Sequence, residues 1–576
     1  MRLKLAFASL LVLSACGTSP DALKALELMQ FHENSAEPGF SYSKLSGSGN
    51  DVKLEGVSFL SSPFMAMMMG MEAPEGEEAS YEADEAVALL TAESVVLNGL
   101  TMKDGMPLVR DMVLNGVSPV GDMGGATITI GSLGIEGLDE KTGAFIASVF
   151  TEAGPAEMPA FEEWAFGKAG VNNIVIKGSV DGETGPTTFD VKVGELSVSD
   201  LDDTIMGLVR IAGIAGEVNV PTEMMPIAAK FDLGTLDIST LQTDVFTRPF
   251  AMVMEGAMDP TATPDYASLY EGYTSPLEPG YDGLNWSGMK IDVSGLKLDT
   301  TAFQHKLTRN PEGVVIGSEM PLSKIKLTAD AAGGMVGAMG LMVLAMGGYQ
   351  SDSIELYTAG NAAFDPEKDV TRLSGYNLGV TGVADMKLEM GIIGLQAALP
   401  GLMASLQNAS DTLGEMATPE LDEDGNPIES DEDMSGASTA MAMQMMFALM
   451  PLQISDIDLT ITDETLMELI LNQQAVGAGQ SLEEFRGELV GMVQGASAFM
   501  TEAGIDPALA NELTAATAGF LAGPGTLRLQ LKPKQPLGIM SAMSTPMTKE
   551  NLGFSATFVP AAPEAPEAPE AAPPTN

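Results

Sequence analysis

Residues 189–198 read FDVKVGELSV, and the pattern of this stretch decides the fold class. Apolar residues alternate with Asp and Lys as far as Val193, and the alternation resumes after Gly194 at Leu196 and Val198. A period of two residues is typical of a β-strand with one apolar and one polar face. The stretch therefore predicts an antiparallel sheet with one face in water.

The same alternation recurs along the chain, with glycines set into it. Further strands are expected at Phe231–Ile238, Met289–Val293 and Ile454–Ile461. Because the spacing of the glycines is irregular, the chain is not a solenoid with a fixed period. The glycines instead predict bulges or bends in many strands of one style. In six places the glycine stands after an apolar and a polar residue and before another apolar residue. These glycines are Gly56, Gly99, Gly116, Gly137, Gly295 and Gly382.

Helices are expected between the strands. Asp200–Ile214 places Ile205, Leu208, Val209 and Ile211 on one side of a helix. Three more helices are predicted near the C-terminus by a Thr-Asp cap, a capping box at Ser481 and Pro507 at the first helical position. They cover residues 463–473, 481–503 and 506–521, and a strand follows at 526–533. We therefore expect an α+β fold of curved, mainly antiparallel β-sheets with helices packed on the apolar face, in two domains of similar style.

One uncharged stretch, AAGGMVGAMGLMVLAMGGY at Ala331–Tyr349, is a candidate membrane-spanning segment. It contains six glycines, which weaken a helix, and no Lys or Arg stands at either end to set a topology. Alternating strands lie on both sides of it. We expect instead a thin, glycine-faced helix that lies against a sheet, with its methionines filling the gap.

The N-terminus has the pattern of an export signal. Arg2 and Lys4 precede the apolar run Leu5–Leu13, which is too short to span a bilayer. The residues Leu13, Ser14, Ala15 and Cys16 then resemble the lipobox of bacterial lipoproteins, and Cys16 is the only cysteine. This resemblance implies that the Cys16 thiol is diacylglycerylated, that the chain is cut before it, and that acyl chains anchor the protein. The residue after the cysteine is Gly17, whereas lipoproteins retained at the inner membrane often carry Asp at this position. The resemblance therefore favours the outer membrane.

The expected order of segments follows from these features and from changes in composition. A Pro/Gly-rich connector is expected to separate two α+β domains, and the C-terminal Pro/Ala/Glu residues predict a disordered tail. The segments are a signal peptide at 1–15, an N-terminal tether at 16–37, a first domain at 38–257, the connector at 258–288, a second domain at 289–559 with an acidic loop at 418–436, and the tail at 560–576.

The second half of the chain also resembles a known family. The helical hairpin, the Gly-Pro-Gly break, LRLQLKPKQPLGI at Leu527–Ile539 and GYNLGVTGVADMKLEM at Gly375–Met390 are similar to exported proteins of the YdgA-like branch of the AsmA-like superfamily. The resemblance implies elongated, curved sheets with an apolar inner face, and for some relatives phospholipid movement across the periplasm. It brings no catalytic motif. The chain departs from the family by starting with a lipobox in place of a transmembrane helix.

Composition argues against several classes of function. The net charge of −51 repels nucleic-acid phosphates, so no nucleic-acid partner is expected. Only His32 and His305 could supply imidazole to a metal, and Cys16 is assigned to lipid. No hydrolase elbow, P-loop or dinucleotide-binding motif occurs. We therefore expect neither an enzyme nor a cofactor nor a metal site.

Methionine is unusually frequent, with 40 residues. Two dense clusters could form a plastic groove for lipid or polypeptide, fill an ordinary core, or bind Cu(I) through thioether sulfur. The candidate hydrophobic groove consists of Met65, Met67, Met68, Met69, Met71, Met441, Met443, Met445 and Met446.

The sequence thus predicts a non-enzymatic, lipid-anchored protein of the cell envelope that faces the periplasm, at the outer rather than the inner membrane. Its expected partners are the membrane, through acylated Cys16, and a lipid or an envelope protein. It is expected to bind lipid acyl chains or a hydrophobic segment of a partner. The alternatives are a structural or assembly factor with a closed core and a Met-rich copper-binding lipoprotein.

Overall fold

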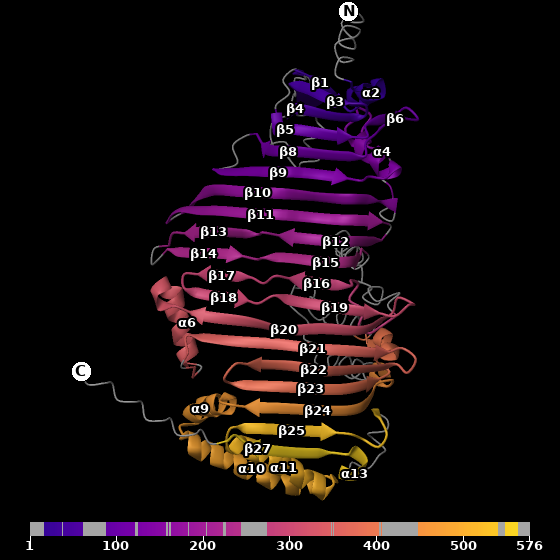
Figure 1. Ribbon diagram of the computed structural model, residues 1–576. Helices are drawn as coiled ribbons and strands as arrows, with labels where there is room; N and C mark the ends of the chain where they lie inside the picture. The colour runs from indigo at the N-terminus through magenta and orange to yellow at the C-terminus, as the bar shows by residue number, and fades with distance from the viewer. Residues whose placement is uncertain are drawn as a thin grey trace, which may run out of the picture. The chain divides into compact units, whose positions relative to one another are not determined.

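The computed structural model describes residues 17–36, 39–60, 88–120, 125–156, 159, 163–182, 184–202, 204–222, 226–243, 274–346, 348–349, 351–402, 405, 447–538 and 548–562. The described chain is mainly β, and its strands are mostly antiparallel (Figure 1). It divides into two compact units. Unit 1 comprises Met1–Arg248, Gly280–Gln304 and Asp330–Ala338, and unit 2 comprises Pro249–Pro279, His305–Ala329 and Met339–Asn576.

Unit 1 is built on a twisting run of strands with two helices at its N-terminal end. Its elements are α2 (Pro20–Leu28), β1 (Phe31–Glu33), β2 (Gly39–Tyr42), β3 (Lys44–Ser48), β4 (Asp51–Leu60), β5 (Ala88–Asn98), β6 (Thr101–Lys103), β7 (Met106–Leu108), β8 (Asp111–Pro119), β9 (Ala126–Glu136), α4 (Glu140–Val149), β10 (Phe166–Gly182), β11 (Gly185–Asp202), β12 (Ile205–Ala212), β13 (Ala215–Val220), β14 (Ile227–Asp232), β15 (Thr235–Gln242), β16 (Gly283–Trp286), β17 (Lys290–Val293) and β18 (Leu296–Thr300).

The sheet of unit 1 follows the chain order. Strands β4, β5, β8, β9, β10 and β11 pair in succession, each antiparallel to the next. Beyond β11 the sheet continues as two shorter rows, β12–β15–β16 and β13–β14–β17–β18. Among the described strands of this unit, β1 and β2 pair in parallel. The residues Gly283–Trp286 of the predicted connector thus belong to this sheet.

The closed core of unit 1 lies between α2 and strands β4, β5 and β8. Leu54 and Leu97 are fully buried there, and the ring of Phe40 stacks at 4.7 Å on Phe31. Helix α2 belongs to this core, because its residues Ala22, Ala25 and Leu26 are buried. The Ser19 hydroxyl accepts a bond from the amide of Ala22 and caps the helix. The segment expected to be a tether is therefore folded from residue 20 onward.

Glycines inside the strands keep the apolar residues on one face. Gly56 in β4 and Gly116 in β8 have φ of +59° and +60°, and the pairing register skips each of them. The residue opposite each glycine is skipped as well, so the register is the same on both sides, and each glycine is a local bend at which the period of two shifts by one position. Leu54 and Val57 are consequently both buried in the same core although their spacing is odd. Of the predicted bulges or bends, these two glycines form bends, because neither strand gains an extra residue there.

The line of irregular positions continues across the sheet to the stretch FDVKVGELSV. Asn173 and Gly194 stand opposite each other and are both skipped, because Asn172 pairs with Glu195 and Ile174 pairs with Val193. The alternation of β11 therefore changes phase at Gly194. The apolar residues before and after that glycine can then point to one face of the sheet.

The helix predicted at Asp200–Ile214 is wrong. Strand β12 occupies this stretch, with Ile211 opposite Leu196 and Val209 opposite Val198 of β11. Asp200, whose φ is +54°, is itself part of strand β11, which extends to Asp202. The apolar spacing fits a helix and a strand equally, and β-branched side chains paired on both edges favour the strand.

Unit 2 likewise contains antiparallel strands, together with the C-terminal helices. Its strands pair in the order β19, β20, β21, β22, β23, β24, β25 and β27, with β26 also against β24. Its elements are β19 (Phe303–Arg309), β20 (Val315–Ala329), α6 (Met335–Met346), β21 (Ser353–Asp365), β22 (Val370–Val380), β23 (Ala384–Ile393), β24 (Gln453–Asp463), α9 (Leu466–Ala478), α10 (Leu482–Glu502), α11 (Pro507–Ala522), β25 (Gly525–Leu531), β26 (Leu537–Gly538), α13 (Lys549–Leu552) and β27 (Ser555–Pro560); the first residues of β19 and α6 fall to unit 1.

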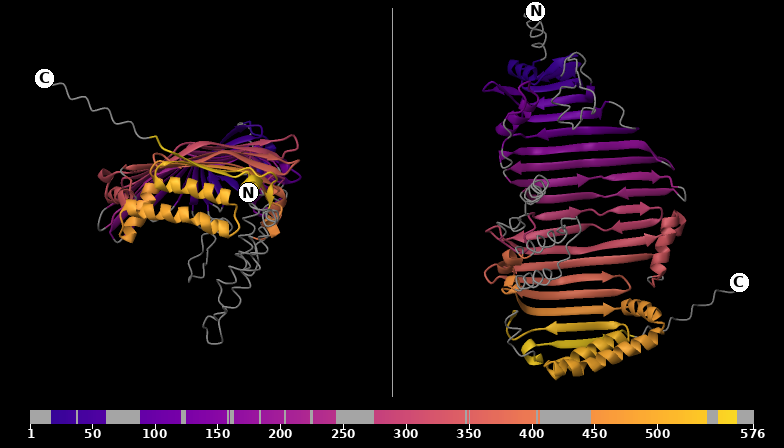
Figure 2. Two further views of the ribbon diagram at one scale, coloured as in Figure 1. Left: turned by 90° about the horizontal axis from the view of Figure 1, so that it is seen from below. Right: turned by 180° about the vertical axis from the view of Figure 1, so that it is seen from behind.

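The three helices predicted near the C-terminus are confirmed. The capping box forms between Ser481 and Glu484 at the start of α10, and Asp506 caps α11 ahead of Pro507. Helices α10 and α11 lie side by side (Figure 2). Helix α11 packs on β25 and β27, where Phe520 meets Phe558 edge to face at 6.3 Å.

The uncharged stretch contains helix α6, as predicted, but its methionines lie elsewhere than expected. A Cβ atom at Gly337 would lie 2.1 Å from the carbonyl oxygen of Asp330, so this glycine permits a close approach. Met339, Met342 and Met346, however, are exposed and fill no gap. None of the helices in the described part of the chain is long and apolar enough to cross a membrane.

Candidate functional site: an apolar groove beneath helix α4

A groove of about 580 Å³ lies in unit 1 between helix α4 and strands β8, β9 and β10. Strand residues form its floor, and the helix with the following turn forms its wall. We call it the α4 groove. It is lined by Met112, Leu114, Leu133, Gly134, Ile135, Phe145, Ile146, Val149, Phe150, Pro155, Ala169, Gly170 and Val171.

The floor is set by the pairing register of the three strands. Leu114 of β8 lies opposite Leu133 of β9, which lies opposite Val171 of β10. A second row joins Met112, Ile135 and Ala169 in the same way. Residues directly opposite in an antiparallel pair share a face, so both rows point into the groove. Leu133 remains 40% exposed.

The wall is held in place by the buried side of α4. Asp139 accepts a bond of 2.8 Å from the amide of Thr142 and caps the helix. Thr142 and Ala147 are fully buried on this side. A Cβ atom at Gly143 would lie 2.2 Å from the carbonyl oxygen of Val109, which shows how closely the helix backbone approaches the adjoining segment. The other side of α4 is left to border the groove.

A charged pair lies beside the groove floor, on the opposite face of the sheet. Lys168 stands next to Ala169 of the groove floor in β10 and pairs at 2.9 Å with Glu195 of the neighbouring strand β11. The bonds from Lys168 and Ser197 lower the pKa of Glu195 below its ordinary value. None of the side chains that line the α4 groove carries a charge or a polar group. The side chains of the groove therefore offer only apolar contacts to a ligand.

The apolar rows of the floor continue across the rest of the sheet of unit 1. Val171 lies opposite Leu196, which lies opposite Ile211 of β12, and the row runs on through Leu236 to Trp286. These residues are only half-buried in the described chain. An apolar stripe thus leads away from the α4 groove along the strand-pairing direction.

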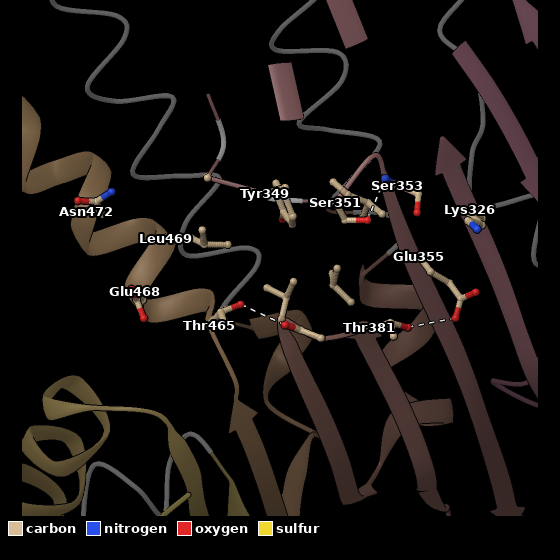
Figure 3. Close-up of a pocket in the computed structure, with 15 residues that line it drawn as sticks. Lys326, Tyr349, Ser351, Ser353, Glu355, Thr381, Thr465, Glu468, Leu469 and Asn472 are labelled. Carbon is tan, nitrogen blue, oxygen red and sulfur yellow. Dashed lines mark hydrogen bonds between the residues drawn. The ribbon is translucent and has the colours of Figure 1, made fainter. Parts of the chain in front are cut away.

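Unit 2 contains a cavity of different character, of about 770 Å³, near the start of α9 (Figure 3). Glu355 accepts bonds there from Lys324 at 2.7 Å and Thr381 at 3.1 Å, and these bonds lower its pKa. We call it the α9 cavity. Its lining is mixed and consists of Lys326, Gly348, Tyr349, Ser351, Ser353, Ile354, Glu355, Val380, Thr381, Gly382, Val383, Thr465, Glu468, Leu469 and Asn472.

The site residues predicted from sequence cannot be compared with either cavity. The lipobox residues Leu13 to Cys16, all nine methionines of the candidate groove and the acidic loop 418–436 lie outside the described residues. The residues of the α4 groove were missed, because they come from ordinary alternating strands. Their signal is the apolar alternation of 112–114, 133–135 and 169–171, which many strands of this chain share.

The two histidines of the chain lie on different strands. His32 lies in β1, and the ring of His305 in β19 is within 2.7 Å of the Ser318 hydroxyl. Burial lowers the pKa of His305. Among the described residues, no group of three or more His, Cys, Asp or Glu side chains is placed to hold a metal ion.

Part of unit 2 matches a known family model. A family model described as "Uncharacterized protein" matches residues 377–557, from within β22 to within β27 of unit 2. No curated protein matches the chain. The matched segment contains the confirmed helices α9, α10 and α11, whereas the α4 groove lies outside it.

Proposed function

We propose that this protein is a non-enzymatic, lipid-anchored protein of the cell envelope that binds lipid acyl chains in the α4 groove. The observation that carries the proposal is the lining of that groove, which is apolar throughout yet leaves Leu133 40% exposed. A closed core would bury such a residue. An acyl chain would cover it.

The size and chemistry of the groove suit such a ligand. Ligand cavities of proteins commonly measure about 300–1,000 Å³, and 580 Å³ falls within that range. Each methylene group that leaves water contributes about 0.8 kcal/mol, so an acyl chain gains affinity without any polar contact. The stripe from Val171 to Trp286 extends the same apolar surface beyond the groove.

The place of the protein in the cell follows from its N-terminus. The lipobox at Leu13–Cys16 supports acylation of Cys16, periplasmic exposure and attachment to the outer rather than the inner membrane. The similarity to AsmA-like proteins favours curved sheets whose helices cover part of an apolar face, in two domains of one style. The partners of this proposal are the membrane and its lipids.

Analysis of bound lipid tests the proposal. The full chain with Cys16→Ser is purified, extracted with organic solvent, and the extract is analysed for fatty acids and phospholipids by mass spectrometry. We expect acyl lipids at a constant molar ratio. Leu133→Glu places a carboxylate in the groove and should release them, since an ionised group is costly beside an acyl chain.

Leu28→Glu is the matched control, because Leu28 is 38% exposed on α2 and lies outside the groove lining. It should retain the lipid of the parent. An extract without lipid, or equal lipid in both Glu variants, would contradict acyl binding in the α4 groove.

A further inference from the structure

We infer that helix α6 is a membrane-contacting helix, which inserts its exposed side chains into the acyl region of a zwitterionic lipid surface. The residues of the α9 cavity that follow the helix would then lie at the level of the head groups. This surface is separate from the α4 groove and has no part in the function proposed above.

The composition and exposure of α6 give the first argument. Its sequence MVGAMGLMVLAM has no polar side chain on any side. Met339, Met342, Val343 and Met346 are 56%, 57%, 65% and 76% exposed. Single exposed apolar residues are common on proteins, whereas these four lie at helical spacing on one uncharged helix and so share one face of it.

The residues that follow the helix give the second argument. The chain turns back at its end, where the amides of Gly348 and Tyr349 donate to the carbonyl oxygens of Ala345 and Leu344 at 3.0 and 2.9 Å. Gly348 and Tyr349 also line the α9 cavity, in which Figure 3 places Tyr349 between Lys326 and Asn472.

The apolar helix is thus followed by the aromatic hydroxyl of Tyr349, which shares the α9 cavity with the ammonium group of Lys326 from β20 and the amide of Asn472 from α9. Tyr residues favour the boundary between hydrocarbon and water, and Lys side chains reach from that boundary to the head groups. This succession matches the layers of a lipid monolayer. A buried protein interface would not need it.

The size of the surface argues against a second copy of the chain as the occupant. Twelve helical residues extend about 18 Å, and a helix face is about 10 Å wide, which gives roughly 180 Å². A stable interface needs about 800 Å² from each partner. Two chains with a net charge of −51 would also repel each other. The same charge disfavours an anionic surface, so we specify zwitterionic lipid.

A single fluorescent label on α6 tests this inference. Cys16→Ser removes the only cysteine, and Val343→Cys then gives one site for the dye NBD. Val559→Cys is the matched control, because Val559 in β27 is 63% exposed and Val343 is 65% exposed. Both full-length proteins are mixed with phosphatidylcholine vesicles, with and without nitroxide groups on the acyl chains. Both carry the same N-terminus, so any attachment there cancels in the comparison.

We expect the label at position 343 to brighten about threefold or more with vesicles and to be quenched by the nitroxide lipid. The label at position 559 should change little. Equal responses at the two positions would overturn the inference. So would a label at position 343 that brightens without lipid as the protein concentration rises, because that result assigns α6 to a second copy. Lipid extraction from the α4 groove is unaffected by either outcome.

Discussion

Truncation of Leu133 is the perturbation whose effect can be worked out most directly from the structure. Leu133 lies in the floor of the α4 groove and is 40% exposed without ligand. Complete burial of a Leu side chain stabilises by about 1.5–3 kcal/mol, so covering the remaining 40% contributes about 0.6–1.2 kcal/mol to binding. Leu133→Ala should therefore weaken the binding of a fatty acid by up to about 3- to 8-fold.

The assay is a titration of the Cys16→Ser protein with a fluorescent fatty acid, followed by displacement with palmitate. Leu28→Ala serves as the control, since Leu28 is exposed to nearly the same extent and lies outside the groove. It should leave the dissociation constant within about 1.5-fold, as expected of an exposed site that does not line the groove. An unchanged constant for Leu133→Ala, or an equal loss in both variants, would refute the assignment of Leu133 to the ligand-binding surface.

Three further predictions concern the core, the polar face and the anchor. Leu54→Ala should lower the free energy of unfolding by about 2–5 kcal/mol in urea denaturation, because Leu54 is fully buried, whereas Val180→Ala at a 54% exposed site should stay within about 0.5 kcal/mol. The two hydrogen bonds from Arg210 lower the pKa of Asp237. This pair therefore stabilises the fold above the unfolded pKa of about 3.9, and the stabilisation is lost as the pH falls through the lower pKa of the folded state. Asp237→Asn should reduce the acid sensitivity of unfolding below about pH 4, and an acid profile identical to that of the parent would contradict the pairing. Cys16→Ser should abolish incorporation of labelled palmitate, and incorporation at the parent level would count against the lipobox.

The elements that could be predicted from sequence are those with a local physical signal. The capping box at Ser481 and the proline at 507 act within one helical turn, and the corresponding helices form where expected. Alternation likewise located β11 and β24. At Asp200–Ile214 the local signal was ambiguous, and pairing of Val209 and Ile211 with neighbouring strands decided the outcome.

The α4 groove could not be predicted, because its residues meet only through the sheet register. Leu114, Leu133 and Val171 are far apart in sequence, and each belongs to a strand that reads like many others. The methionine clusters are conspicuous in the sequence, but the frequency of a residue type does not determine where its side chains lie in the structure. Helix α6 shows this, since its methionines were expected to pack and are exposed.

Photo-crosslinking with a diazirine fatty acid tests the central claim most directly. The probe is bound to the full chain with Cys16→Ser, activated by light, and the adducts are located by peptide mass spectrometry. Acyl binding in the α4 groove predicts adducts concentrated within residues 112–171, which contain every lining residue. An excess of unlabelled palmitate should remove them. Adducts spread over the chain without competition, or confined to segments outside 112–171, would contradict the claim.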